Sequence, residues 1–417
     1  MVRTDIPFDE QIALLMRGVS FGDDAIAASM EAELRQRLAE SHATGRPLRV
    51  YLGVDPTSTD IHLGHTVPLR KLRQFQDLGH DVVFLIGSFT ALIGDPSDKD
   101  RARPRLTPEQ VREHAQTYVE QVARILDPQR TTVEYNDRWL APLSFADLID
   151  LAGHFTVQQF LTRDNFAQRF ANGDPIWLHE FCYALMQAYD AVTLRTDVQV
   201  GGTEQLFNLM AGRKLMEAMG MRPQVCLTLP ILVGTDGHMR MSKSAGNAIG
   251  IAEPPEGQYG KVMSIPDVAM RNVAELVTRW TPAEIERLLG EVDAGTLHPR
   301  DAKMRLAFEI VDILHGTEAA ERAQAHFEAV FQRRSLPSEI PDLPLDGPTA
   351  LVDALVEAGM AQSKSQARRL VVQGGVRLDG QTVDDVEAVL EARGQVLQVG
   401  KRRYVRLVDA EGPNVAR

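Results

Sequence analysis

The sequence predicts an α/β protein whose first domain is built on an open parallel sheet. Strand-like apolar runs such as "LRVYLGV", "DVVFLIG" and "TDVQVGG" alternate with longer segments of helical periodicity. The run "DVVFLIG" is apolar almost throughout, which is typical of a parallel strand covered on both faces. This alternation of strand and helix predicts a Rossmann-like sheet with ligands at the carboxyl ends of its strands.

The elements of this domain can be predicted in order along the chain. Helices are expected over residues 1–45, where "DDAIAASMEAELRQRLAE" is amphipathic. A strand is expected at 48–54, a helix at 64–78 and a second strand at 81–87. The helix of "LTPEQVREHAQTYVEQVARIL" begins with a Thr-Pro pair that suits its N-cap and first position. The remaining elements are strand "TTVEYN", helix "WLHEFCYALMQAYD", strand "TDVQVGG", helix "TEQLFNLMAGRKLMEAMG" and strand "PQVCLTLP".

With 417 residues, the chain is too long for one ordinary core. From about residue 255 the segments are helical, with no convincing strand between them. The stretch "SLPSEIPDLPLDGP" contains four prolines and no periodicity, as a linker does. We therefore expect a catalytic domain at 1–250, a helical domain at 251–335, a linker at 336–348 and a small α+β domain at 349–417.

Composition excludes several classes of protein. The formal charge of −12 argues against non-specific adhesion to nucleic acid, so no DNA partner is expected. The only cysteines, Cys182 and Cys226, lack metal-ligand spacing, and no metal site is expected. No window reaches the ~18 apolar residues that span a bilayer, and the first residues lack a signal-peptide core. We expect a soluble, cytoplasmic protein without a membrane partner.

Two histidines surround a glycine where the first sheet strand leads into a helix. In "HLGH", His62 and His65 lie at a helix start, where unpaired N–H groups and the helix dipole favour phosphate. Gly64 removes a side chain where a base or ribose would lie close to the backbone. Alone, this motif fits a polar turn equally well.

A second stretch, "DGHMRMSKSAGN" at 236–247, places Arg240 and Lys243 in a loop that contains Gly and Ser. Such a loop suits a mobile cationic flap over a polyphosphate, although a solvated basic loop has the same composition. It follows the last predicted strand of the sheet whose first strand precedes "HLGH". Both motifs are therefore expected at the strand-carboxyl edge, which favours a nucleotide site.

These two motifs resemble the HIGH and KMSKS signatures of class I aminoacyl-tRNA synthetases. The stretches "GVDPT", "LIGDPS", "YALMQAYD" and "QVGGTEQLFN", in this order, resemble those of tyrosyl-tRNA synthetases. The similarity covers 48–250 and extends through the helical region and the tail, which resembles a small RNA-binding module shared with a ribosomal small-subunit protein. It implies a homodimer that activates L-tyrosine with ATP and transfers it to the 3′ end of its cognate tRNA.

The resemblance also implies the roles of individual residues. The residues expected to bind tyrosine are Tyr51, Asp95, Tyr183, Gln187, Asp190, Gln199 and Gln205. Those expected to bind ATP are Gly53, Asp55, His62, Gly64, His65, Gly202, Glu204, Met241 and Lys243. Those expected to act in catalysis are Thr57, His62, His65, Arg240 and Lys243.

Within the tyrosine set, Tyr51 and Asp190 match the pair that binds the substrate phenol. Asp95, Tyr183 and Gln187 match the group around the substrate ammonium. Helical spacing puts 183, 187 and 190 on one face, which also fits a satisfied core network without a ligand.

The chemistry implied for this site needs no general base, because a tyrosine carboxylate is ionised at neutral pH. The task is to align two anions and to stabilise charge on the α-phosphate. Mg²⁺ is expected to accompany ATP, held mostly by phosphate and water. Two residues depart from the family pattern: Arg240 replaces the first lysine of the signature, and Glu204 replaces an aspartate.

The RNA partner requires a local basic surface on this acidic chain. "AQSKSQARRLVVQGGVR" contains Lys364, Arg368, Arg369 and Arg377 without an acid, which suits contacts with phosphates but also a solvated face. The resemblance implies that the helical domain helps to read the anticodon. The stretch "PIWLHEF" is a candidate subunit interface, or plain core.

Three alternatives remain open from sequence. These are a tryptophanyl-tRNA synthetase with the same phosphate motifs, a non-catalytic RNA-binding relative, and a small-molecule nucleotidyltransferase, which shares the "HxGH" turn but has no use for a basic tail.

Overall fold

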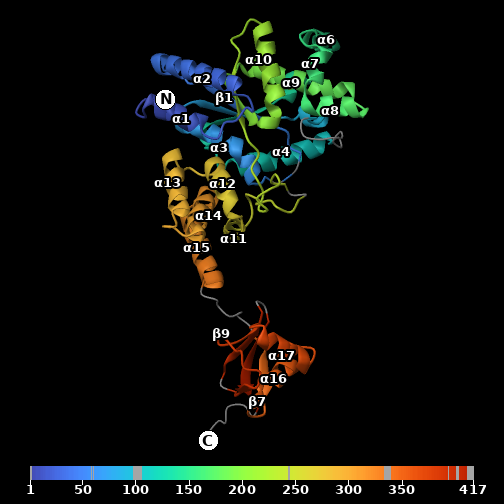
Figure 1. Ribbon diagram of the computed structural model, residues 1–417. Coiled ribbons are helices and arrows are strands. Elements are labelled where there is room, and N and C mark those ends of the chain that lie inside the picture. Colours follow the sequence, from blue (N-terminus) through green and yellow to red (C-terminus); the bar gives the residue numbers. More distant parts are fainter. Residues whose placement is uncertain are drawn as a thin grey trace. The chain divides into compact units, whose positions relative to one another are not determined.

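The computed structural model describes residues 2–57, 59, 61–96, 106–242, 245–332, 340–392, 394–400 and 403–410. The chain forms two compact units, Met1–Glu328 and Ala329–Arg417, and each is described by itself (Figure 1). The described part of the chain contains no helix with both the length and the apolar character of a bilayer span.

A five-stranded parallel sheet of order β3-β2-β1-β4-β5 forms the centre of the first unit, which confirms the predicted fold class. The strands are β1 (Arg49–Val54), β2 (Asp81–Ile86), β3 (Thr131–Tyr135), β4 (Val198–Gly202) and β5 (Val225–Leu229). The strand order reverses between β1 and β4, and at such a point the connecting segments leave to opposite sides. A crevice is therefore expected at the carboxyl ends of these two strands.

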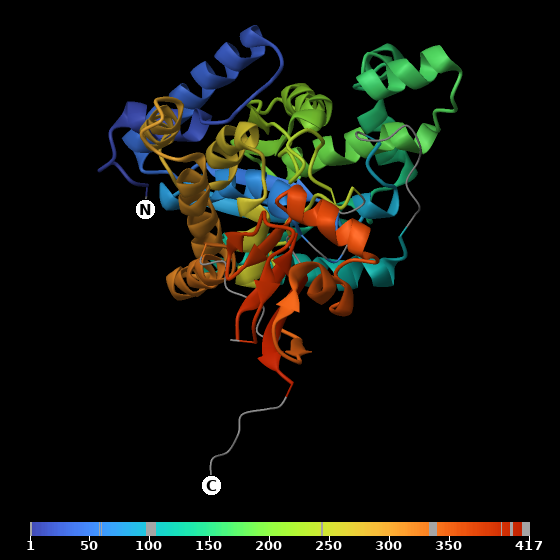
Figure 2. The same cartoon turned by 60° about the horizontal axis from the view of Figure 1, so that its bottom comes forward.

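Helices surround this sheet. Those before residue 123 and those between 178 and 218 lie where the sequence predicted helices, whereas the four between 137 and 172 were not predicted. They are α1 (Phe8–Met16), α2 (Asp24–Thr44), α3 (Leu63–Asp77), α4 (Pro108–Val122), α5 (Asp137–Leu140), α6 (Phe145–Ala152), α7 (Val157–Leu161), α8 (Asp164–Asn172), α9 (Leu178–Leu194) and α10 (Leu206–Ala218). Short 3-10 turns cover Thr90–Leu92, Pro128–Arg130 and Thr203–Gln205. Helix α4 begins as expected, because Thr107 caps it through a capping box. Helices α1 and α2 lie at one end of the unit and α6–α8 at the other (Figures 1 and 2).

Asp197 fixes the amino-terminal ends of the two central strands. Its side chain is buried and accepts hydrogen bonds from Arg37 Nη1 at 2.6 Å, from both Nη atoms of Arg46 and from Arg49 N at 2.9 Å. Burial by itself raises the pKa of Asp197, but these donors hold it below its usual value. Removing one partner from a buried ion pair of this kind costs about 3–5 kcal/mol.

The helices after the sheet share its hydrophobic core. They are α11 (Pro255–Met263), α12 (Met270–Val277), α13 (Pro282–Asp293), α14 (Pro299–His315) and α15 (Thr317–Phe327), with a 3-10 turn at Asp267–Ala269 and a π-turn at Glu328–Gln332. Buried residues from Ile12 to Ala323 form one continuous cluster, and α12 packs against α3. From 255 to 332 the described residues contain no strand, as the sequence predicted.

The second unit is a small α+β domain, which confirms the predicted class of the tail. Its mixed sheet has the order β6-β12-β11-β8-β9, and a separate pair joins β7 to β10. The strands are β6 (Asp342–Leu345), β7 (Thr349–Ala350), β8 (Val376–Leu378), β9 (Gln381–Thr382), β10 (Val389–Leu390), β11 (Val396–Val399) and β12 (Arg403–Asp409). Helices α16 (Leu351–Glu357) and α17 (Lys364–Val372) pack against them over an independent core.

Candidate active site

The two histidines of "HLGH" cap helix α3 reciprocally. His62 Nδ1 accepts a hydrogen bond from Gly64 N at 3.1 Å, and His65 Nδ1 accepts one from His62 N at 3.3 Å. Because both Nδ1 atoms accept, each neutral ring carries its proton on Nε2. A side chain at Gly64 would bring its Cβ within 2.9 Å of the His62 ring, so glycine is needed at this position.

The segment that follows the second motif forms backbone hydrogen bonds with the first motif. Leu63 N donates to Ile249 O at 2.9 Å and Ile251 N donates to Ile61 O at 3.0 Å, around an antiparallel bridge between His62 and Gly250. The segment that follows the 236–247 loop is thus joined by backbone hydrogen bonds to "HLGH". The predicted proximity of the two motifs is present in the structure.

A cavity of about 510 Å³ lies between these motifs and the end of β4. Of the residues predicted from sequence, it is lined by Thr57, His62, Gly64, His65, Gly202, Glu204, Arg240 and Met241. Lys243 lies outside the described residues. The carboxylate of Glu204 lies against Gly202, where an added Cβ would be 2.2 Å from Glu204 Oε1.

A second cavity of about 230 Å³ adjoins the first. It is lined by all seven residues predicted to bind tyrosine, namely Tyr51, Asp95, Tyr183, Gln187, Asp190, Gln199 and Gln205, and also by Gly53 and Asp55. Thr57, His65, Gly202 and Glu204 line both cavities, so the two form one composite site. The site lies at the carboxyl ends of β1 and β4, where the strand order reverses.

Tyr51 and Asp190 form the buried end of the smaller cavity. Tyr51 is 0% exposed, and its hydroxyl has no hydrogen-bond partner among the described residues. Asp190 is 3% exposed, and burial raises its pKa to about 8 although Trp139 and Asn136 donate hydrogen bonds to it. A buried hydroxyl without a partner next to a buried carboxyl is costly in a protein interior. A polar ligand group between them would satisfy both.

A hydrogen-bond network that the sequence did not reveal holds Asp190. Trp139 Nε1 donates to Asp190 Oδ1 at 2.7 Å, and Asn136 Nδ2 donates to Asp190 Oδ2 at 3.2 Å. Asn136 Nδ2 also lies 3.1 Å from the hydroxyl of Thr90. The position of Asn136 at the carboxyl end of the predicted strand "TTVEYN" was a usable signal, but Trp139 and Thr90 offered none.

This network continues to the nucleotide side of the site. Thr90 Oγ1 donates to Asp55 Oδ1 at 2.7 Å, and the Tyr183 hydroxyl donates to Asp55 Oδ2 at 3.0 Å. Burial, with the charge of Asp55 next, raises the pKa of Tyr183 well above its usual value, so this phenol stays a donor. The polar groups at the two ends of the smaller cavity are therefore linked through Asn136 and Thr90.

Asp95 and Gln205 lie together on another wall. Gln205 Nε2 donates to Asp95 Oδ2 at 2.6 Å, and the buried guanidinium of Arg163 lies 3.7 Å from Asp95 Oδ1. Gln199 pairs with Tyr51 across β1 and β4 and accepts a hydrogen bond from Gln224. The carboxylate of Asp95 is thus held in one orientation by Gln205 and Arg163.

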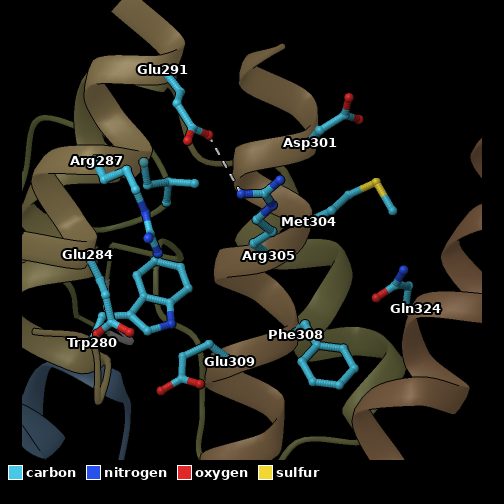
Figure 3. A pocket seen from close by; sticks show the side chains of 11 residues that line it. Trp280, Glu284, Arg287, Glu291, Asp301, Met304, Arg305, Phe308, Glu309 and Gln324 are labelled. Carbon is cyan, nitrogen blue, oxygen red and sulfur yellow. Dashed lines mark ion pairs between the residues drawn. The ribbon is translucent and has the colours of Figure 1, made fainter. Parts of the chain in front are cut away.

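Other predicted residues lie away from these cavities. Lys364, Arg368 and Arg369 are exposed on α17 and Arg377 is on β8, all in the second unit, where Lys364 pairs with Asp353. A separate cavity of about 490 Å³ lies among α13, α14 and α15, with Trp280 and Phe308 on its walls and Arg305 paired with Glu291 (Figure 3). No residue predicted for the site lines it. The described residues contain no cluster of His, Cys, Asp and Glu arranged to hold a metal ion.

Comparison with known proteins identifies the family. A model described as tRNA synthetases class I (W and Y) matches residues 43–332, and one described as tyrosine–tRNA ligase SYY-like C-terminal domain matches 333–407. The chain is 49% identical over 404 residues to the tyrosine–tRNA ligase of Thermotoga maritima, across 97% of this chain and 98% of that protein. The chain belongs to the tyrosyl-tRNA synthetase family.

One further relative agrees with this membership, and a solved structure shares the fold. The tyrosine–tRNA ligase of Moorella thermoacetica is 49% identical over 399 residues, 95% of each chain. A C-terminally truncated mitochondrial tyrosyl-tRNA synthetase of Aspergillus nidulans has a similar structure, with a TM-score of 0.62, 22% identity and coverage of 78% of this chain and 94% of that one. The tyrosyl-tRNA synthetase family is thus supported by sequence, and its fold by structure.

The raised pKa of Asp190 predicts that the free energy of unfolding depends on pH. The folded chain holds the Asp190 proton to about pH 8, whereas an unfolded chain releases it near pH 3.9. The folded state therefore binds more protons in this window, and its stability falls as pH rises. We expect the free energy of unfolding of Asp190→Asn, minus that of the unmodified protein, to increase from pH 5 to pH 8 in urea titrations.

The matched control is Asp197→Asn. The pKa of Asp197 is lowered, so its contribution to stability is complete above the unfolded value and is lost only as pH falls through the folded one. The free energy of unfolding of Asp197→Asn, minus that of the unmodified protein, should therefore stay constant between pH 5 and pH 9. A constant difference for Asp190→Asn over the same range would contradict the prediction.

Proposed function

We propose that this chain is a tyrosine–tRNA ligase. It activates L-tyrosine with ATP to form tyrosyl-adenylate and pyrophosphate, and then transfers tyrosine to the 3′ end of its cognate tRNA. The observation that carries the proposal is the buried Tyr51–Asp190 pair at the end of a cavity that adjoins the "HLGH" cavity. Relatives that share 49% of their residues with this chain are named tyrosine–tRNA ligases.

The substrate phenol binds between Tyr51 and Asp190. Its hydroxyl gives the Tyr51 hydroxyl a partner and makes a hydrogen bond with the Asp190 carboxyl, which Trp139 and Asn136 hold in place. Phenylalanine fits the same volume but would leave the Tyr51 hydroxyl without a partner and would take from the Asp190 carboxyl its hydrogen bond to the substrate. Each unsatisfied buried polar group costs about 1–3 kcal/mol, so discrimination comes from this pair.

The substrate ammonium binds near Asp95, Tyr183 and Gln187. Asp95 supplies the compensating charge, and its orientation is set by Gln205 and Arg163. With the phenol and ammonium held, the tyrosine carboxylate points to the wall shared by the two cavities. Gln199 supports the opposite side of the ring through its place on β4.

The ATP phosphates bind between the two signature motifs. His62 and His65 donate from Nε2, and Arg240 and Lys243 supply positive charge, so charge that builds on the α-phosphate is stabilised without a proton transfer. Thr57 lies where the two cavities join and orients the reacting groups. Gly53, Asp55, Gly64, Gly202, Glu204 and Met241 form the surrounding nucleotide site.

Mg²⁺ enters as a complex with ATP. Among the described residues the nucleotide cavity offers one carboxylate, that of Glu204, alongside histidines and Arg240. This donor set fits an ion whose ligands are mainly phosphate oxygens and water. The ion would neutralise the phosphate charge that the carboxylate of tyrosine must approach.

Amino-acid-dependent exchange between ATP and pyrophosphate tests this function. We expect tyrosine to support exchange, and phenylalanine to support it at least about 30-fold less well because two buried groups lose a hydrogen bond to the substrate hydroxyl. Chelation of Mg²⁺ should abolish the exchange. Exchange with tryptophan alone would support the tryptophanyl alternative, and RNA binding without any exchange would support the non-catalytic one.

The second unit is proposed to bind tRNA. Arg368 and Arg369 are exposed on α17, and with Lys364 and Arg377 they give this acidic chain a local basic surface for phosphates. We further propose the division of the chain at residues 250 and 335, with the helices of 251–335 contacting the anticodon region. The stretch 336–348, predicted as a linker, contains β6 of the second unit's sheet. Tyrosine activation uses none of these surfaces.

Removal of residues 340–417 separates the two steps of the reaction. Because the first unit has its own core, we expect tyrosine-dependent exchange to stay within about twofold of the full chain. Charging of tRNA should fall by at least 10-fold, since each lost phosphate contact weakens binding. Aminoacylation with labelled tyrosine measures this, and equal charging by the shortened chain would contradict the role of the second unit.

A homodimer is proposed through the α6–α8 face. Its exposed apolar side chains are Phe145, Ile149, Val157 and Phe170, and the start of α9 adds Trp177 and Leu178. Leu178 is 82% exposed and Phe170 67%, although large apolar side chains are usually buried. Exposed apolar patches on a protein surface are typical of subunit interfaces. This favours the interface alternative for "PIWLHEF".

Charge placed on this face should prevent assembly. We expect Phe170→Glu combined with Leu178→Glu to weaken the dimer at least 100-fold, because two large side chains contribute about 1.5–3 kcal/mol each when buried. Sedimentation velocity at several concentrations measures the change. Val268→Glu is the matched control, since Val268 is exposed on another part of the same unit and should leave the dimer intact. A protein that is monomeric before substitution would refute the proposal.

A further inference from the structure

The strand that carries Arg240 belongs to a short hairpin. Val233 and Arg240 form an antiparallel bridge, and Met241 N donates to Leu232 O at 2.8 Å. The second arm of this hairpin, Arg240–Ser242, lines the nucleotide cavity. A contact that holds Arg240–Ser242 in place therefore also holds one wall of the nucleotide cavity in place.

The side chain of Asn247 fixes it. Asn247 is 4% exposed, and its Oδ1 accepts a hydrogen bond from Ser242 N at 2.8 Å. Its Nδ2 donates to Arg240 O at 3.1 Å and to Asp236 Oδ2 at 2.6 Å. One amide thus uses its acceptor and both of its donors to join the second arm to the turn of the hairpin.

The surroundings of Asn247 are shaped for this contact. An added Cβ at Gly234 would lie 2.1 Å from Asn247 Nδ2, so the first arm can hold only glycine here. Asp236 is itself fixed, because its Oδ1 accepts from the backbone N–H groups of His238 and Met239, both at 2.9 Å. These bonds and the one from Asn247 lower the pKa of Asp236, so a carboxylate faces the amide.

The same segment is anchored to the opposite wall. Ile249 O, two residues after Asn247, accepts from Leu63 N at 2.9 Å, beside the bridge of His62 with Gly250. Asn247 therefore lies between a backbone junction with "HLGH" and a side-chain junction with Arg240–Ser242. No other described side chain bonds to the turn and to both of these backbone positions of the second arm.

We propose that Asn247 is a positioning residue for ATP. Its amide sets the Arg240–Ser242 wall of the nucleotide cavity at a defined distance from the His62–His65 wall. It acts through Arg240 and Ser242 and does not touch the nucleotide. The inference deepens the proposed function and depends on it, and none of the tyrosine-binding residues takes part.

Asn247→Asp tests the proposal in the full chain. The carboxylate has nearly the same shape and still accepts from Ser242 N, but it cannot donate to Arg240 O and it repels Asp236. We expect KM for ATP in the exchange reaction to rise on the order of 10-fold to 100-fold, as for a misplaced binding wall. The dissociation constant of tyrosine, measured without ATP by equilibrium dialysis, should stay within twofold.

A reciprocal exchange of the two groups distinguishes positioning from general damage. In the double variant Asp236→Asn, Asn247→Asp the amide and the carboxylate face each other again with their positions reversed. We expect KM for ATP to recover by at least fivefold from the single variant, about the value of one neutral hydrogen bond. Gln373→Glu, an amide-to-carboxylate change at an exposed position of the second unit, is the control and should leave both constants unchanged.

The outcomes separate the inference from the function. If the unmodified chain shows no tyrosine-dependent exchange, the proposed function fails. If it does, and Asn247→Asp keeps KM for ATP within twofold, or weakens tyrosine binding equally, or is not improved by the reciprocal variant, the inference fails. If Asn247→Asp does not fold, Asp236→Asn alone decides, with an expected rise of about fivefold in KM for ATP and rejection if there is none.

Discussion

The parallel pairing of β1 with β4 is the constraint on which the site depends. Arg49 and Asp197 are 148 residues apart in sequence, yet the backbone N–H of the first donates to the carboxylate of the second. This contact and the Arg37–Asp197 ion pair hold the amino-terminal ends of the two strands together. Their carboxyl ends then diverge into different helices, and Tyr51, Gln199 and Gly202 face the space that is left.

The polar groups at this opening oppose folding and favour binding. Tyr51 and Asp190 are buried, and the hydroxyl of the first has no partner among the described residues. The surrounding network of Trp139, Asn136 and Thr90 holds Asp190 in one orientation, while burial raises its pKa to about 8. An unsatisfied buried group of this kind persists at a functional site only where the rest of the fold compensates for its cost. The apolar core behind the sheet, which continues into α11–α15, supplies that support.

The sequence was sufficient for the elements and for the residues that act directly. Apolar runs bounded β1 and β2 to within a residue or two, and the capped start of α4 was visible in its Thr-Pro pair. All seven residues that the ordered motifs assigned to tyrosine binding line the smaller cavity. Trp139, Thr90 and Asn247 escaped notice, because an indole, a hydroxyl or an amide acquires its role only from a partner distant in sequence, and the sequence pattern does not encode that approach. Arg163 beside Asp95 belongs to the same class.

The contact of Glu204 with Gly202 has a consequence for how this chain can evolve. Any side chain at 202 would occupy the volume that the glutamate carboxylate already fills. A larger residue at 202 therefore requires the end of the Glu204 side chain to move, and a shorter acid at 204 would relieve this contact. The effect of a substitution at one of these positions is therefore expected to depend on the residue at the other.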